Sequence, residues 1–195
     1  IRTLLSHDLD RALRIVAGWT DSEDTDVRRL ATEGTRPYLP WSVRVPGIIA
    51  RPGLTVPILD ALYCDESDFV RRSVANHLND LSRDNPGLVV TTAGHWLENR
   101  DNNTEQLVRH GLRTLIKRGH PTALGLLGFA PATVQIDGPT LDTTHVAFGG
   151  SVRFTATIHN TGPETARLAI DYIVHHQKAN GTQTGKTFKL TTHTL

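Results

Sequence analysis

The sequence predicts a mainly α protein, in which a solenoid of stacked helix pairs is followed by a smaller antiparallel β domain. Two observations lead to this fold class. Aligning Val27, Val70 and Val108 brings Val-Arg-Arg, Val-Arg-Arg and Val-Arg-His into register, at spacings of 43 and 38 residues. From about Pro131 onward, helical spacing of the apolar residues gives way to alternation in twos. A helical unit that recurs about every 40 residues is typical of a HEAT-like solenoid, which presents one face of each helix pair to a ligand.

Helical periodicity of the apolar residues predicts the solenoid elements in order. The first helix is expected over residues 3–18. Asp21 or Ser22 is the expected N-cap of the next helix, which Gly34 ends. Residues 35–53, which contain several Pro and Arg, are expected to be a connection. The remaining helices are expected over residues 54–63, 68–83, 87–98, 104–118 and 121–128.

The alternating segment predicts antiparallel strands with one buried face, separated by turn-forming residues such as Asn180-Gly181. We count about five strands, fewer than the seven of a complete immunoglobulin-like sandwich. The expected domains are therefore residues 1–129, the helical repeats, and residues 130–195, a partial immunoglobulin-like β domain. Because the sequence begins with Ile and contains no Met, the simplest interpretation is that it belongs to a longer protein.

Composition narrows the classes of function. The net charge is only +1, so a nucleic-acid surface requires an uneven placement of the 21 Lys and Arg residues. Cys64 is the single cysteine, which excludes an intrachain disulfide and a multi-cysteine zinc site. The ten histidines have no metal-site spacing, so we expect no metal and no cofactor. No apolar run approaches the roughly 20 residues that span a bilayer, and we expect a cytoplasmic bacterial protein without membrane contact.

One polar helix face recurs in the repeats. Positions four apart share a helix face, so Arg72, Asn76 and Asp80 line up. In the preceding repeat, Arg29 and Glu33 take the places of Arg72 and Asn76. Stacked repeats would bring the carboxylates of Glu33 and Asp80 together inside a frame of cations. Such a row is either a groove for a polyanion or a set of solvated salt bridges, and spacing alone favours the salt bridges.

Three strings resemble those of the DNA alkylation repair glycosylases of the AlkC/AlkD superfamily, and of AlkC-type members in particular. They are residues 27–41 (VRRLATEGTRPYLPW), residues 70–80 (VRRSVANHLND) and residues 113–119 (RTLIKRG). The resemblance covers residues from about 20 to 128. AlkC-type members also carry an immunoglobulin-like domain after the helical repeats, where the β segment lies in this chain.

The resemblance implies a monofunctional DNA glycosylase that excises cationic N-alkylated bases in base excision repair. The expected substrate is 3-methyladenine, with 3-methylcytosine as a further candidate, and the family acts without full base flipping. The catalytic carboxylates of the family map to Glu33 and Asp80, and a further family carboxylate lies upstream of residue 1. The implied partner is double-stranded DNA containing alkylated bases, bound by a monomer.

The chemistry of a cationic base agrees with these residue types. Its glycosidic bond is already weak, so negative charge beside the developing sugar oxocarbenium ion and a positioned water assist the reaction more than a strong acid does. Glu33 or Asp80 is expected to supply the negative charge and to position the water. Trp41 is the candidate for contact with the cationic base through its π surface, and the alternative is that Trp41 packs between repeats.

The candidates for contact with DNA are Arg28, Arg29, Arg36, Arg51, Arg71, Arg72, Asn76, Asn79, Arg83, Arg113 and Lys117. About half of these cations are expected to form bridges between repeats instead. A non-catalytic HEAT-repeat scaffold that binds DNA or a protein through the same groove is the alternative function. The two carboxylates favour the glycosylase, because a pure phosphate binder would avoid negative charge in its groove.

Overall fold

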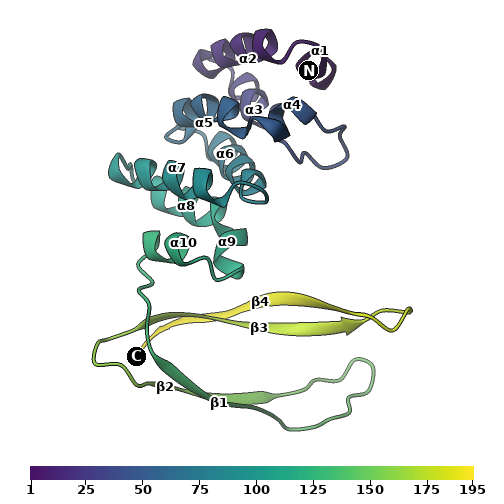
Figure 1. The fold of residues 1–195 in the computed structure, drawn as a ribbon, viewed down its shortest axis with the longest axis vertical. Coiled ribbons are helices and arrows are strands. Elements are labelled where there is room, and N and C mark those ends of the chain that lie inside the picture. Colours follow the sequence, from purple (N-terminus) through teal and green to yellow (C-terminus); the bar gives the residue numbers. More distant parts are fainter. The chain divides into compact units, whose positions relative to one another are not determined.

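The computed structural model describes all 195 residues, and the chain divides into two compact units, residues 1–127 and 128–195. Helices make up the first unit and antiparallel strands the second, which confirms the predicted fold class (Figure 1). None of the helices has the length and apolar character needed to cross a membrane.

The helices of the first unit are α1 (Arg2–His7), α2 (Leu9–Ala17), α3 (Thr25–Glu33), α4 (Pro46–Ala50), α5 (Val56–Leu62), α6 (Asp68–Leu81), α7 (Pro86–Glu98), α8 (Thr104–Gly111), α9 (Arg113–Lys117) and α10 (Pro121–Leu126). Short 3₁₀ helices lie at Gly18–Asp21 and Pro52–Thr55. Figure 1 shows the helices of this unit stacked in chain order.

Local capping moves several of the predicted boundaries. The single helix expected over residues 3–18 is two helices, because Asp8 leaves the helical conformation and its side chain accepts a bond from the Arg11 amide. The N-cap of α3 is Asp24, whose carboxylate accepts from the Asp26 amide, and not Asp21 or Ser22. Residues 35–53 include α4, which Pro46 begins. The helix expected over residues 104–118 is interrupted at Leu112.

Helix α6 lies at the centre of the first unit and packs against α3 on one side and α8 on the other. Val70, Val74, Leu78 and Leu81 form its fully buried stripe at helical spacing. Burying such side chains contributes about 1.5 to 3 kcal/mol each. This packing fixes the last turn of α3 beside the C-terminal half of α6.

The second unit contains four strands rather than the expected five: β1 (Val134–Leu141), β2 (Phe154–Asn160), β3 (Arg167–Gln177) and β4 (Gln183–Thr194). They form two antiparallel pairs, β1 with β2 and β3 with β4. Tyr172 of β3 contacts Phe154 of β2 and Phe188 of β4, with ring centroids 5.6 and 5.3 Å apart. The contact between Tyr172 and Phe154 therefore joins the two strand pairs.

Candidate active site

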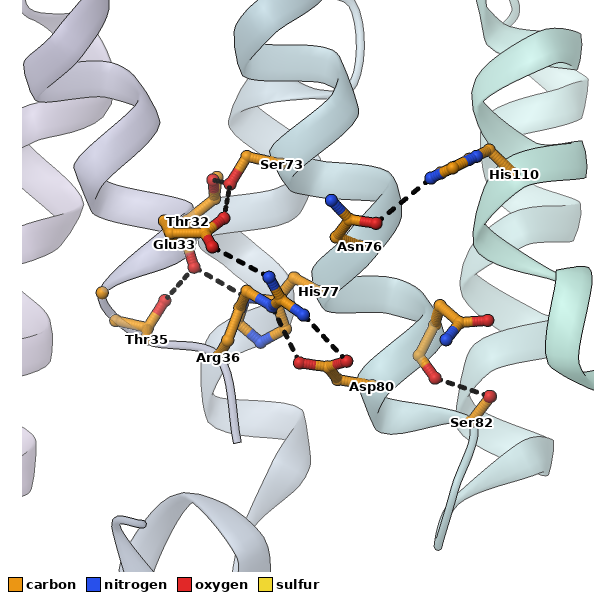
Figure 2. Close-up of polar contacts among 12 residues, drawn as sticks. Thr32, Glu33, Thr35, Arg36, Ser73, Asn76, His77, Asp80, Ser82 and His110 are labelled. Atoms are coloured by element: carbon orange, nitrogen blue, oxygen red, sulfur yellow. Dashed lines mark hydrogen bonds and ion pairs between the residues drawn. The ribbon is translucent and has the colours of Figure 1, made fainter. Parts of the chain in front are cut away.

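The structure brings Glu33 and Asp80 together around one guanidinium group. Glu33 ends α3, Asp80 lies in the last turn of α6, and Arg36 follows α3 in the chain. Arg36 donates through Nε and Nη2 to the two Asp80 carboxylate oxygens at 2.8 and 3.1 Å. Its Nη1 donates to Glu33 Oε1 at 2.8 Å. Figure 2 shows Arg36 between the two carboxylates, so two neighbouring repeats meet at this cluster.

The cluster is largely withdrawn from solvent, with side-chain exposures of 17% for Glu33, 10% for Arg36 and 11% for Asp80. Burial raises the pKa of Asp80, and the hydrogen bond from Arg36 opposes that rise. Burial acts to lower the pKa of Arg36, but its bonds and charge interactions with Asp80 and Glu33 outweigh this, and the pKa is raised. With both carboxylates ionised, the three side chains carry a net charge of −1.

The second oxygen of Glu33 is held by residues that the sequence analysis did not single out. Ser73 of α6, which is buried, donates its hydroxyl to Glu33 Oε2 at 2.8 Å. The Thr32 hydroxyl lies 2.5 Å from that of Ser73 (Figure 2). The signal for Ser73 was its position on the apolar stripe of α6, because a buried hydroxyl needs a polar partner.

His77 joins the same two helices from inside the core. Its Nδ1 lies 3.0 Å from the Thr32 carbonyl oxygen, which can only accept, so Nδ1 carries the proton. Its Nε2 is buried without a hydrogen-bond partner. Complete burial lowers the pKa of His77 to about 3, and Arg36 and Arg2 contribute to the lowering. The imidazole is therefore neutral and ties α6 to the end of α3.

Trp41 lies on the connection after α3 and is fully exposed, at 106% of its reference area. The alternative that it packs between repeats is therefore wrong. Its φ is +60°, a left-handed conformation that costs a residue with a Cβ about 1 kcal/mol. Buried Arg2 holds both ends of this loop by donating to the carbonyl oxygens of Gly34, Arg36 and Val43 at 2.7 to 3.2 Å. The loop therefore presents a strained, solvent-facing indole from a fixed base.

Besides Arg36, which was expected at DNA and instead bonds Glu33 and Asp80, two more of the candidate DNA-binding arginines are engaged inside the protein. Arg28 is buried and donates to Asp65 at 2.7 and 3.2 Å and to the carbonyl oxygen of Ser22 at 2.9 Å. Arg71 donates to the carbonyl oxygens of Asp65 and Glu66 at 2.6 and 2.8 Å. Arg28 thus joins α3 to the next repeat, as was expected of about half of the candidates, whereas Arg71 holds the loop between α5 and α6 of its own repeat.

The amides of Asn76 and Asn79 make the specific contacts that their place inside a helix demands. Asn76 Oδ1 accepts from His110 Nε2 and from Arg113 Nη2, each at 3.1 Å (Figure 2 shows the His110 bond). Asn79 Oδ1 accepts from the Thr114 amide at 3.2 Å. All three bonds link α6 to the following repeat, so both side chains help to hold the two repeats together.

The other candidate cations lie nearer to solvent. Arg29 stacks on Phe69 at 4.3 Å and lies 3.7 Å from Glu33. Exposed Arg72 pairs with Asp68 at 2.8 Å. Arg51 pairs with Asp10 at 3.3 Å, Arg83 stacks on Tyr38, and Lys117 is exposed. No group of three or more His, Cys, Asp or Glu side chains is arranged to hold a metal ion.

Comparisons with known proteins bear on both units. Residues 135–195 match the family described as "Uncharacterised protein YhaZ, C-terminal Ig-like domain". The uncharacterized protein YhaZ of Bacillus subtilis (strain 168) is 35% identical over 192 residues, which are 98% of this chain and 53% of that protein. A solved structure, Pseudomonas fluorescens alkylpurine DNA glycosylase AlkC bound to DNA containing an abasic site analog, matches 100% of this chain and 54% of its own, with 40% identity and a TM-score of 0.90.

The chain thus spans about half the length of the two bacterial proteins it matches. The resemblance predicted from the helical strings is confirmed, and the structural match extends through the β unit to the last residue. In sequence and in fold, the chain is similar to AlkC along its whole length, with helical repeats followed by an Ig-like domain.

Proposed function

We propose that the protein is a monofunctional DNA glycosylase that releases cationic N-alkylated bases from double-stranded DNA as the first step of base excision repair. The proposed substrates are 3-methyladenine first and 3-methylcytosine second. The observation that carries the proposal is the pairing of Glu33 and Asp80, from two consecutive repeats, around Arg36. The likeness to AlkC, a glycosylase whose structure holds DNA with an abasic site analog, supports it.

The proposed mechanism uses the negative charge of this cluster. An N3-alkylated adenine leaves as a neutral base, taking the electron pair of the glycosidic bond, while positive charge develops on the sugar. The net charge of the cluster stabilises that oxocarbenium ion in a site of low exposure, where electrostatic interactions are stronger than in water. Water then bonds to the sugar carbon and gives a proton to a carboxylate oxygen. Arg36 holds both carboxylates in position for this step, and Ser73 holds the second oxygen of Glu33.

Trp41 is proposed to contact the cationic base. Exposed aromatic faces attract cations, and the indole is the most exposed aromatic side chain of the helical unit. Arg29, Arg72, Arg113 and Lys117 are proposed to meet DNA phosphates from the same unit. Arg29 and Arg72 would exchange their present carboxylate partners for phosphate oxygens.

The alternative, a non-catalytic scaffold, is favoured by one observation: Arg36 already satisfies both carboxylates as an inter-repeat bridge would. A base-release measurement separates the two functions. Methylated DNA is incubated with the full-length protein and the released bases are identified by chromatography. The glycosylase predicts release of 3-methyladenine, strongly reduced in Glu33→Gln/Asp80→Asn. The control is Asp68→Asn, which changes an exposed carboxylate of the same helix. A wild-type protein that binds the DNA and releases no base is a scaffold.

A further inference from the structure

Two arginines meet on one tyrosine ring beside the candidate active site. The guanidinium carbon of Arg83 lies 4.6 Å from the centroid of the Tyr38 ring, and that of Arg44 lies 5.3 Å from it. Both arginines are exposed, and neither forms an ion pair with a carboxylate. Neither guanidinium charge is neutralised by a bonded carboxylate, so both attract an anion from outside the protein.

The fold builds this pair from the same two segments that build the carboxylate cluster. Tyr38 and Arg44 lie on the connection after α3, and Arg83 follows the end of α6. Arg36 bonds Asp80, and two residues farther along the connection the Tyr38 hydroxyl donates to the carboxylate of Asp84, four residues after Asp80. Asp80 lies in the last turn of α6, and Asp84 lies in the turn that follows this helix. The two arginines are therefore held on the same two segments as the candidate active site.

The Tyr38 ring acts as a fixed platform for both guanidinium groups. Its bond to Asp84 engages the hydroxyl, at the edge of the ring, whereas the arginines lie over the ring. That bond is the main cause that raises the pKa of Tyr38, and the charges of Arg83 and Arg44 act in the opposite direction. The ring thus restrains both side chains while their N–H groups stay available to an outside ligand.

We propose that Arg44 and Arg83 form a binding site for a backbone phosphate of the DNA strand, next to the bound lesion. The inference rests on the proposed function, because it takes DNA as the ligand. Guanidinium groups match the geometry of phosphate oxygens, and contacts to phosphates fix the register of a protein on DNA without reading its sequence. The site would hold the backbone on the same two segments as the carboxylates that would meet the damaged nucleotide.

The test measures binding of an unmodified DNA duplex by the full chain, by fluorescence anisotropy between about 50 and 200 mM salt. The double variant Arg44→Ala/Arg83→Ala removes one neutralised phosphate and should lower the magnitude of the slope of log K against log[salt] by about 0.9, and each single variant should lower it by less. Tyr38→Leu, which removes the platform and keeps both charges, should weaken binding with little change of slope. The matched control is Arg11→Ala/Arg100→Ala, two exposed arginines elsewhere in the helical unit, with an unchanged slope expected.

The proposed site is wrong if the Arg44→Ala/Arg83→Ala variant keeps the wild-type salt slope. It is also wrong if the control Arg11→Ala/Arg100→Ala loses as much of the slope as that variant does. A double variant that loses thermal stability and keeps its DNA affinity also overturns it, since the stack is then structural. Base release is measured separately on methylated DNA. A wild-type protein that binds with the expected slope and releases no base overturns the glycosylase and leaves the phosphate site standing. Normal binding by the double variant of an active glycosylase overturns the site alone.

Discussion

Two neighbouring regions of the helical unit use arginine in opposite ways. At the junction of α3 and α6, Arg36 is buried and both carboxylates near it are satisfied. On the connection that follows, Arg44 and Arg83 share an aromatic ring without an acidic partner, and Trp41 stands in solvent. Buried, paired charges hold repeats together, whereas exposed charges are what a partner meets. The internal partner of an arginine therefore tells more about its role than its position in the repeat does.

The largest effect expected from breaking the paired region is that of Asp80→Asn on catalysis. Loss of the carboxylate charge should slow base release by about 10² to 10⁴, measured in single turnover with saturating protein. The structure adds a second effect, because Arg36 loses a charged acceptor for two of its bonds. We expect about 1 to 2 kcal/mol less stability in urea unfolding.

Asp68→Asn is the matched control, since it removes an exposed carboxylate of the same helix, and it should leave both quantities near wild type. Glu33→Gln should show a smaller loss of rate, because Ser73 and Arg36 can still hold the side chain in place. A wild-type single-turnover rate in folded Asp80→Asn would remove Asp80 from the mechanism.

The second prediction concerns acid and the buried His77. The folded protein keeps this imidazole neutral down to a pH of about 3, whereas the unfolded chain protonates it below about 6.5. The unfolded state therefore binds more protons in this window, and stability falls as pH drops from 6.5 toward 3. The contribution of His77 approaches one proton, or about 1.4 kcal/mol per pH unit.

The measurement is urea unfolding at several pH values for the wild type and His77→Gln, whose amide can keep the bond to Thr32. The variant should show a shallower loss of stability toward low pH. His7→Gln is the control, because solvent reaches the His7 ring in the folded and unfolded chain alike. An unchanged pH slope in His77→Gln would show that His77 is protonated in the folded protein.

The fold was largely predictable from the sequence because the repeat is local. Valine and leucine spacing located α6 almost to its ends, and alternation identified the β unit. The errors arose where a single side chain decides the backbone. Asp8 splits the first helix by capping α2, and Pro46 begins a helix inside a segment that looks like a connection. Periodicity cannot reveal such breaks, because the apolar pattern continues across them.

The site was predictable in its carboxylates and not in its framework. The repeat register placed Glu33 beside Asp80, but Arg36, expected at DNA, sits between them, and Arg2 was not considered at all. Both arginines act through contacts made more than 30 residues away in the chain, and a helical repeat carries no information about those partners. Arg44 was missed for the same reason, since only the fold brings it to the ring beside Arg83.

The third prediction sets one arginine from each class side by side. Arg28→Ala leaves buried Asp65 without its partner, so the melting temperature should fall by several degrees while DNA affinity per folded molecule stays unchanged. Arg72→Ala removes only the exposed ion pair with Asp68, so its melting temperature should stay unchanged. Its DNA binding should be weaker than that of the wild type. If fully folded Arg28→Ala bound DNA more weakly than the wild type, the distinction between buried and exposed arginines would be lost.

The smallest expected effect sharpens the comparison at Trp41. The indole makes no packing contact that its removal would cost, so Trp41→Ala should keep the wild-type melting temperature. Trp41→Gly should raise stability by about 1 kcal/mol, because glycine adopts the φ of +60° without strain. Both variants should slow base release about tenfold, the scale of losing one base–aromatic contact. Val43→Ala, an exposed apolar change on the same loop, should alter neither quantity. A substitution at Trp41 can therefore raise stability while it lowers activity. At the Arg36 cluster, a substitution lowers both. A lower melting temperature with full activity in Trp41→Ala would make the tryptophan structural and leave the base without its proposed contact.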